Sequence, residues 1–99
     1  MILTIDEIRT KIRPICDQYK IEKVWLFGSY ARGEAREDSD VDLHVKAAEE
    51  MRFLELGGFY ADLEEILGKE IDLITRIPEE YKIFKKYVAR EEILIYDSE

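Results

Sequence analysis

Two short segments, 41–46 and 70–75, alternate between apolar and polar side chains, and this limits the chain to a sheet with one buried face and one open face. The apolar side consists of Val41, Leu43, Val45, Ile71 and Leu73. The opposite side consists of Asp40, Asp42, His44, Lys46, Glu70 and Asp72. We therefore expect helices to cover the apolar face and the other face to stay open and to carry three aspartates.

The first of the covering helices is predicted over residues 5–19. Thr4 and Glu7 precede and open it at the spacing of a capping box. Proline removes a backbone donor and clashes with the preceding turn, so Pro14 should kink or split this helix. Its apolar residues recur at helical intervals: Ile5, Ile8, Ile12, Ile15 and Tyr19.

A second amphipathic helix is predicted over residues 53–67. Gly57 and Gly58 weaken its first half and would let another part of the chain pack closely. Gly68 fits the position just past the helix end. Its apolar side consists of Leu56, Phe59, Tyr60, Leu63 and Leu67.

Three further predicted elements complete the order of helices and strands along the chain. Residues 24–27 form an apolar strand that stops at Gly28, a last helix opens at Pro78 and runs to about Ala89, and residues 93–96 add an edge strand. The order predicts the α/β (α+β) class, with a small mixed β-sheet and helices on one face. We expect residues 1–99 to form a single domain.

The composition narrows the possible partners. The chain has a formal net charge of −8, which argues against direct nucleic-acid binding because attraction to phosphate needs a basic face. A basic protein partner or a metal-bridged nucleotide suits this charge better. The single cysteine, Cys16, lies in a helical pattern and is expected to be a buried thiol. No apolar run approaches the ~20 residues of a membrane span, so we expect no membrane association and a cytoplasmic location.

The three aspartates have both an ordinary and a functional interpretation. A solvated sheet face can simply carry acids. However, Asp40 and Asp42 share a face about 6.6 Å apart, where they repel each other but can chelate together. Asp72 adds a third carboxylate at the same phase of another strand. The pair Gly28-Ser29 lies between a strand and a helix start, where backbone amides and a hydroxyl can hold a phosphate.

Such oxygen ligands suit Mg²⁺ or Mn²⁺, which complete their shells with water and substrate phosphates. Two such ions can stabilise the attacking and leaving oxygens of a phosphoryl displacement. A triphosphate facing three aspartates without metal would be repelled. The acids therefore predict a metal-dependent reaction on a nucleotide.

Neighbouring residues are less informative. Arg32 and Arg36 could offset triphosphate charge, or they could belong to a solvated charged loop. For His44, a half-exposed strand position is favoured over a role as ligand or base. Trp25 and Phe27 are expected in the core or on a sheet face rather than stacked on a base.

The run GSYARGEAREDSDVDL carries a resemblance to a known family. Gly28-Ser29, ten intervening residues and then Asp40-Val41-Asp42 resemble the GS-x10-DxD motif of the polymerase-β-like nucleotidyltransferase superfamily. The fuller run, together with IDLIT at 71–75, is similar to the minimal nucleotidyltransferase (MNT) group. The likeness covers nearly the entire chain.

This resemblance implies specific roles. Asp40 and Asp42 would bind two magnesium ions, and Asp72 would complete the shell of the catalytic ion and help to deprotonate the acceptor hydroxyl. Gly28 and Ser29 would contact the phosphates of ATP, and AMP would be transferred with release of pyrophosphate.

The family also implies an acceptor. Minimal nucleotidyltransferases are commonly antitoxins whose partner is a helical HEPN-type toxin with RNase activity, neutralised by AMP on a tyrosine in a heteromeric pair. Two alternatives stay open: a non-catalytic antitoxin that binds its toxin directly, and a nucleotidyltransferase for a small acceptor such as an aminoglycoside.

Overall fold

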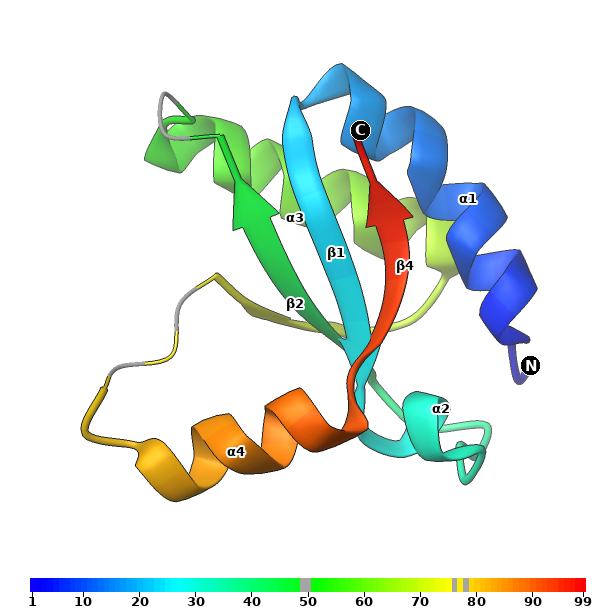
Figure 1. Ribbon diagram of the computed structural model, residues 1–99. Helices are drawn as coiled ribbons and strands as arrows, with labels where there is room; N and C mark the ends of the chain where they lie inside the picture. Colours follow the sequence, from blue (N-terminus) through cyan, green and yellow to red (C-terminus); the bar gives the residue numbers. More distant parts are fainter. Residues whose placement is uncertain (49–50, 76, 78) are drawn as a thin grey trace.

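The computed structural model describes residues 1–48, 51–75, 77 and 79–99, which form a mixed four-stranded sheet and four helices (Figure 1). The elements are α1 (Ile5–Gln18), β1 (Ile21–Phe27), α2 (Gly28–Arg32), β2 (Val41–Ala47), α3 (Phe53–Leu67), β3 (Ile71–Ile74), α4 (Lys82–Glu91) and β4 (Ile93–Asp97). The strand order is β3-β2-β1-β4. β1 pairs antiparallel with β2 and β4, whereas β3 runs parallel to β2. The predicted mixed sheet is confirmed.

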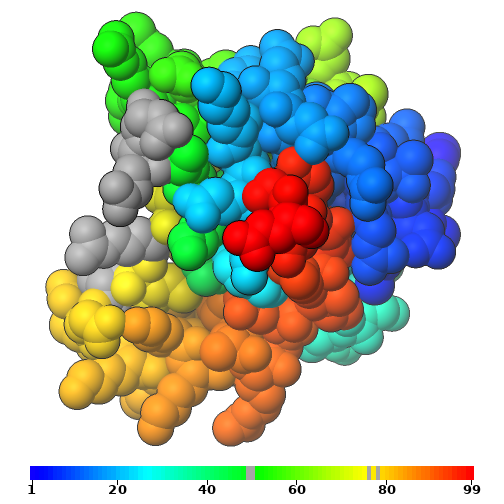
Figure 2. All heavy atoms as spheres, turned by 45° about the horizontal axis from the view of Figure 1, so that its top comes forward, coloured from blue at the N-terminus to red at the C-terminus, as the bar shows by residue number. Residues whose placement is uncertain are grey.

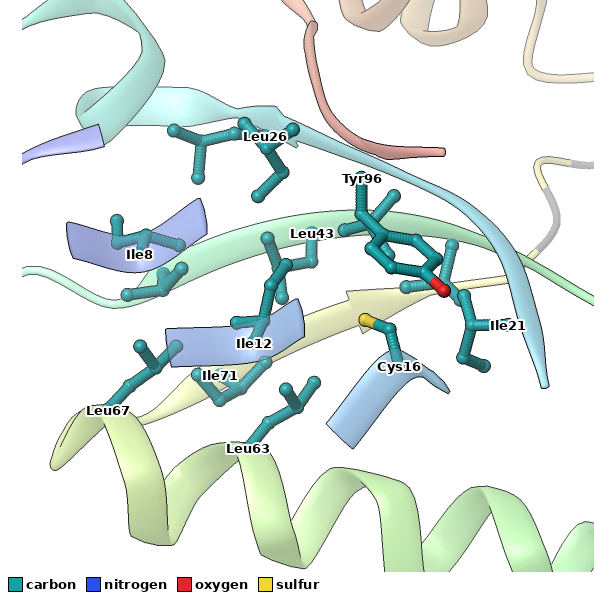
Figure 3. Packing of buried hydrophobic residues seen from close by; sticks show 14 of the residues in the cluster. Ile8, Ile12, Cys16, Ile21, Leu26, Leu43, Leu63, Leu67, Ile71 and Tyr96 are labelled. Atoms are coloured by element: carbon teal, nitrogen blue, oxygen red, sulfur yellow. The ribbon is translucent and has the colours of Figure 1, made fainter. Parts of the chain in front are cut away.

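Helices α1 and α3 cover one face of the sheet, and the opposite face has no comparable layer (Figure 1). Figure 3 shows the core between this helix pair and the strands, with Ile12 and Cys16 of α1 near Leu63 of α3. The predicted apolar strand face points into this core, and Val41, Leu43 and Val45 are fully buried. The alternation in the sequence therefore identified the buried face correctly.

Helix α1 begins as predicted but does not break. Thr4 Oγ1 accepts from the backbone N–H of Glu7 at 3.0 Å, and Glu7 Oε1 accepts from the N–H of Thr4 at 2.9 Å. Pro14 lies within one continuous helix, so the predicted split is wrong. Pro14 is exposed, whereas the buried residues Ile12 and Cys16 lie on either side of it. Burial of that continuous apolar face outweighs the lost backbone hydrogen bond.

The predicted glycines of α3 have separate roles. Gly68 ends the helix in the left-handed conformation, with φ of 64°. Gly58 lies against Tyr19 of α1, because a methyl group at Gly58 would be 3.0 Å from Tyr19 Oη. A methyl group at Gly57 would meet no atom within 4 Å. The predicted close packing therefore applies to Gly58 alone.

The last helix differs most from its prediction. α4 begins at Lys82 and ends at Glu91, later than the predicted span from Pro78 to about Ala89. Pro78 itself lies outside the described residues. β4 lies at the sheet edge, next to β1, as predicted for residues 93–96.

Two predictions about the chain as a whole can be compared with the structure. Cys16 is fully buried, and this burial raises the pKa of its thiol to about 12, in agreement with an inert structural role. Within the described residues, none of the helices combines the length and the apolarity that a bilayer crossing requires.

Candidate functional site

The open face of the sheet brings Asp42 and Asp72 side by side. These residues are direct partners in the parallel pairing of β2 with β3, so both side chains leave the sheet on the same side. Asp40 lies immediately before the first residue of β2. The structure thus places together two carboxylates that are 30 residues apart in sequence, and the third, Asp40, directly precedes the start of β2.

The electrostatics of Asp42 show how closely these acids lie. Several causes together raise the pKa of the Asp42 carboxyl from 3.8 to about 6, and partial burial is the largest of them. The other causes that raise it are a hydrogen bond with Asp72 and the negative charges of Asp72 and Asp40, whereas the positive charge of Arg32 lowers it. Asp42 therefore carries a charge that its surroundings disfavour, and a bound cation would relieve this repulsion.

Gly28 closes one side of this cluster. β1 ends at Phe27, which pairs with Asp42, and Gly28 follows with φ of 75°. A methyl group on Gly28 would lie 2.1 Å from Asp42 Oδ2, well inside contact distance. Only glycine fits here, because the backbone is left-handed and the carboxylate occupies the space of a side chain. The Gly-Ser turn and the aspartates of the motif are therefore in direct contact.

Helix α2 carries the rest of the predicted turn. Ser29 is half-buried in its first turn, and Tyr30 anchors the helix in the core at 3% exposure. Arg32 ends α2, and Gly33 follows in the left-handed conformation.

Arg32 belongs to a hydrogen-bonded cluster rather than to a free loop. Its Nε donates to Glu34 Oε1 at 2.9 Å, and its Nη1 donates to Glu91 Oε2 at 3.0 Å and to Tyr87 Oη at 3.3 Å. The contacts with Tyr87 and Glu91 connect Arg32, at the end of α2, to α4. Tyr87 and Glu91 were not predicted at the site. They lie 55 and 59 positions from Arg32 in the sequence, and no pattern of neighbouring residues predicts these contacts.

His44 occupies the half-exposed strand position expected for it. Its Nδ1 lies 3.0 Å from Glu92 Oε2, and its ring centroid lies 5.0 Å from that of Trp25. Trp25 is half-buried on the same face, because it pairs with His44 across β1 and β2. A sheet-face position for Trp25 was one of the two expected.

The donor set suits a divalent ion that shares its shell with substrate. In the described part of the chain, no group of three His, Cys, Asp or Glu residues forms a ready metal cage. Mg²⁺ does not require one, since it is usually held by one or two carboxylates together with water and substrate phosphates. The adjoining carboxylates of Asp42 and Asp72, with Asp40 nearby, fit that mode of binding.

Comparison with known proteins places the chain among nucleotidyltransferases. The family described as "Polymerase beta, Nucleotidyltransferase" matches residues 10–99. A Methanocaldococcus jannaschii protein, provisionally named a protein adenylyltransferase, is 42% identical over 73 residues, which are 74% of this chain and 78% of that protein. Protein adenylyltransferase MntA of Thermococcus cleftensis is 35% identical over 82 residues, covering 76% of this chain and 80% of that protein.

Solved structures agree on the fold. A structure provisionally named a minimal nucleotidyltransferase has a TM-score of 0.73 and 32% identity, and the match covers 92% of this chain and 95% of the other. A toxin-antitoxin crystal structure with AMP-PNP has a TM-score of 0.73 at 21% identity, covering 92% and 74%. A Shewanella oneidensis complex of a tri-AMPylated HEPN toxin with an MNT antitoxin has a TM-score of 0.68 at 19% identity, covering 96% and 74%.

Proposed function

The chain belongs to the polymerase beta nucleotidyltransferase family and is therefore a nucleotidyltransferase, and from this premise we propose that it transfers AMP from ATP to a tyrosine hydroxyl of a HEPN-type RNase toxin and so acts as its antitoxin. The names of its relatives support this acceptor class. MntA is named a protein adenylyltransferase, and the Shewanella oneidensis toxin is described as AMPylated in complex with an MNT antitoxin. The AMP-PNP of another similar structure supports ATP as the donor.

One observation carries the proposal: the Asp42 and Asp72 carboxylates adjoin on an open face and Gly28 packs against Asp42. In this assignment Asp40, Asp42 and Asp72 would hold two Mg²⁺ ions. The ions would supply charge neutralisation for the attacking and leaving oxygens. The raised pKa of Asp42 supports the assignment, because repelling carboxylates gain most from a cation.

The residues of this chain would also position the reactants. Gly28 and the N–H groups of the turn approach the β- and γ-phosphates, and Ser29 adds a hydroxyl. Arg32 adds a positive charge near Asp42, where it already lowers the pKa of that carboxyl. Holding the triphosphate in line with the acceptor supplies much of the rate enhancement of a phosphoryl transfer.

The reaction balances without any further reagent. The tyrosine oxygen forms a bond to the α-phosphorus of ATP, the bond from that phosphorus to the bridging oxygen breaks, and pyrophosphate leaves. The hydroxyl proton passes by way of Asp72 to solvent. The open sheet face beside Asp72 leaves space for an acceptor side chain to approach, because Asp72 is exposed.

The test uses ATP labelled at the α-phosphate, Mg²⁺ and the protein encoded by the neighbouring gene. Label should appear on the partner with the unaltered chain and disappear with Asp72→Asn and Asp42→Asn. Asp38→Asn is the matched control, because Asp38 is an exposed acid of the same loop. ATP labelled at the γ-phosphate should leave the partner unlabelled.

Neutralisation of the toxin distinguishes transfer from direct binding. If Asp72→Asn still neutralises the partner at equal dose, the catalytic proposal fails and steric inhibition takes its place. Label on an aminoglycoside rather than on the protein would instead indicate a small-molecule transferase.

A further inference from the structure

Helix α4 is poorly covered by the rest of the chain. Val88 is its one buried residue in the structure, at 1% exposure. On the same helix Ile83 is 87% exposed, Phe84 44% and Tyr87 48%. Figure 1 shows α4 at the end of the sheet, away from the layer of α1 and α3, and the orange atoms of α4 lie along the lower edge of the molecule in Figure 2. The side chains of Ile83, Phe84 and Tyr87 line a hollow of about 690 Å³, together with Tyr81, which is 58% exposed.

A helix this short does not stand alone. α4 has ten residues, fewer than the ~12–15 that an isolated helix needs to be even marginally stable in water. Most helical stability in proteins comes from burying an apolar face, yet the apolar face of α4 is in water. This surface, defined by Tyr81, Ile83, Phe84 and Tyr87, is the α4 face. Its composition is that of a surface that another molecule covers.

Charge beside the α4 face indicates what that molecule is like. Lys82, Lys86 and Arg90 recur at intervals of four and form one exposed basic stripe along the helix. In the part of the chain that the structure describes, none of these three has an ion-pair partner, whereas Lys85 pairs with Glu79 at 2.6 Å. The chain as a whole has a charge of −8, so the stripe is a local exception. An acidic rim on the partner would complement it.

The α4 face is also attached to the candidate site. Tyr87 Oη accepts from Arg32 Nη1, and Glu91 of the same helix pairs with Arg32 Nη1 at 3.0 Å. Arg32 in turn ends α2, and this helix begins at Gly28, where an added methyl group would lie 2.1 Å from Asp42 Oδ2. A molecule resting on α4 would therefore lie beside α2, the helix whose first residue, Gly28, adjoins Asp42.

We propose that the α4 face is the docking surface for the protein that receives the nucleotide, through an apolar patch on that protein rimmed by Asp and Glu carboxylates. The inference rests on the proposed function for the identity of the partner as acceptor. Aromatic and large aliphatic anchors with flanking cations are typical of protein interfaces. The net negative charge of the chain disfavours RNA at the same surface.

The experiment measures the affinity of the chain for the protein encoded by the neighbouring gene, by isothermal titration calorimetry without ATP. The test variants are Ile83→Glu with Phe84→Glu, and separately Lys82→Glu with Lys86→Glu. The matched control is Phe53→Glu with Leu54→Glu at the start of α3, where both side chains are 86% exposed. Circular dichroism and ATP binding of each variant verify that the fold and the site are intact.

The α4 variants should raise the Kd for the partner by about thirtyfold or more, and the α3 control should leave it unchanged. Equal affinity of all variants, or no binding by the unaltered chain, overturns the proposal. The proposal is also overturned if the chain alone forms a dimer and the double variant Ile83→Glu with Phe84→Glu is monomeric, since a second copy would then cover α4. Salt-sensitive binding of bulk RNA, lost only in the lysine variant, overturns it as well.

Failure of the docking surface and failure of the proposed function give different results. Affinity is measured in parallel with Asp42→Asn, which should bind the partner normally. Absence of AMP transfer with normal, α4-dependent binding contradicts the proposed function and leaves the docking surface standing. Transfer that persists in α4 variants of unchanged affinity contradicts the docking surface alone.

Discussion

Gly28 and Asp42 are in such close contact that a single added methyl group on Gly28 would lie 2.1 Å from the Asp42 carboxylate oxygen. The contact joins the end of β1 to the middle of the acidic cluster, since Phe27 and Asp42 are partners across the antiparallel pair. It also explains why the Gly-Ser turn and the aspartates occur together in the sequence. Gly28 of the turn packs against the Asp42 carboxylate and so limits where this carboxylate can lie.

Gly28→Ala should reduce nucleotidyl transfer by about 100-fold or more, because it displaces the carboxylate of Asp42, which we propose as a ligand of the catalytic ions. The left-handed backbone alone should cost about 1–2 kcal/mol of stability. Gly33→Ala is the matched control, because Gly33 also has a positive φ, of 73°, but no atom lies within 4 Å of an added methyl group. Stability of both variants is measured by urea unfolding and activity by label transfer. Equal activity of the two variants would contradict the positioning role of Gly28.

Asp42→Asn should stabilise the metal-free protein at neutral pH. Folding raises the pKa of Asp42 from 3.8 to about 6, so the native state holds its proton more tightly than the unfolded chain. Its contribution to stability is therefore complete below pH 3.8 and is lost as the pH rises through 6. Since Asp42 is only partly buried, we expect a gain of about 1 kcal/mol above pH 7, or about 4–8 °C in Tm.

Thermal unfolding in EDTA between pH 4 and pH 8 checks this prediction. The gap between Asp42→Asn and the unaltered chain should close toward the acidic end of the range. Asp38→Asn, an exposed acid outside the cluster, should show no such pH-dependent gap. A gap that widens as the pH falls has the wrong sign and would contradict the proposed cause of the shift.

Arg32→Ala should weaken ATP binding by about tenfold, because it removes a positive charge and charge-assisted hydrogen bonds. It should also raise the pKa of Asp42 further, since Arg32 lowers that pKa. Arg36→Ala is the control, because within the described residues only the backbone of Arg36 is hydrogen-bonded: its N–H donates to Ser39 Oγ and its C=O accepts from the N–H of Ser39. Fluorescent ATP titration gives the affinity, and carboxyl NMR gives the pKa. Similar affinity of both variants would place Arg32 outside the nucleotide site.

Gly57→Ala should stabilise the protein by about 0.5–1 kcal/mol, because alanine is the better helix former and nothing lies near the added methyl group. Gly58→Ala should gain less, since its methyl group would press on Tyr19 Oη at 3.0 Å. That hydroxyl donates to Asp62 at 2.7 Å and has little freedom to move away. Chemical unfolding compares the pair, and equal gains would show that the contact with Tyr19 yields without cost.

The first helix and the last helix show how far local patterns predict the fold. The capping box at Thr4 and the glycine stop at Gly68 were predictable, because each depends on residues a few positions apart. Pro14 was expected to kink or split α1, and it does not split the helix, because a local rule ignores the core that the helix covers. α4 was expected too early in the chain. It begins only at Lys82, and nearly all of its surface is exposed.

The sequence by itself determined the open acidic face. Residues alternate in a strand, so Asp42 and Asp72 had to share the side opposite the core once their strands lay in one sheet. Only the tertiary structure decided that β3 pairs in parallel with β2 and sets these two carboxylates next to each other. Only the tertiary structure brought Tyr87 and Glu91 to Arg32 and left the α4 face without cover. Alternation and capping act over a few residues, whereas register and docking depend on contacts between distant segments, which form only when the whole core assembles.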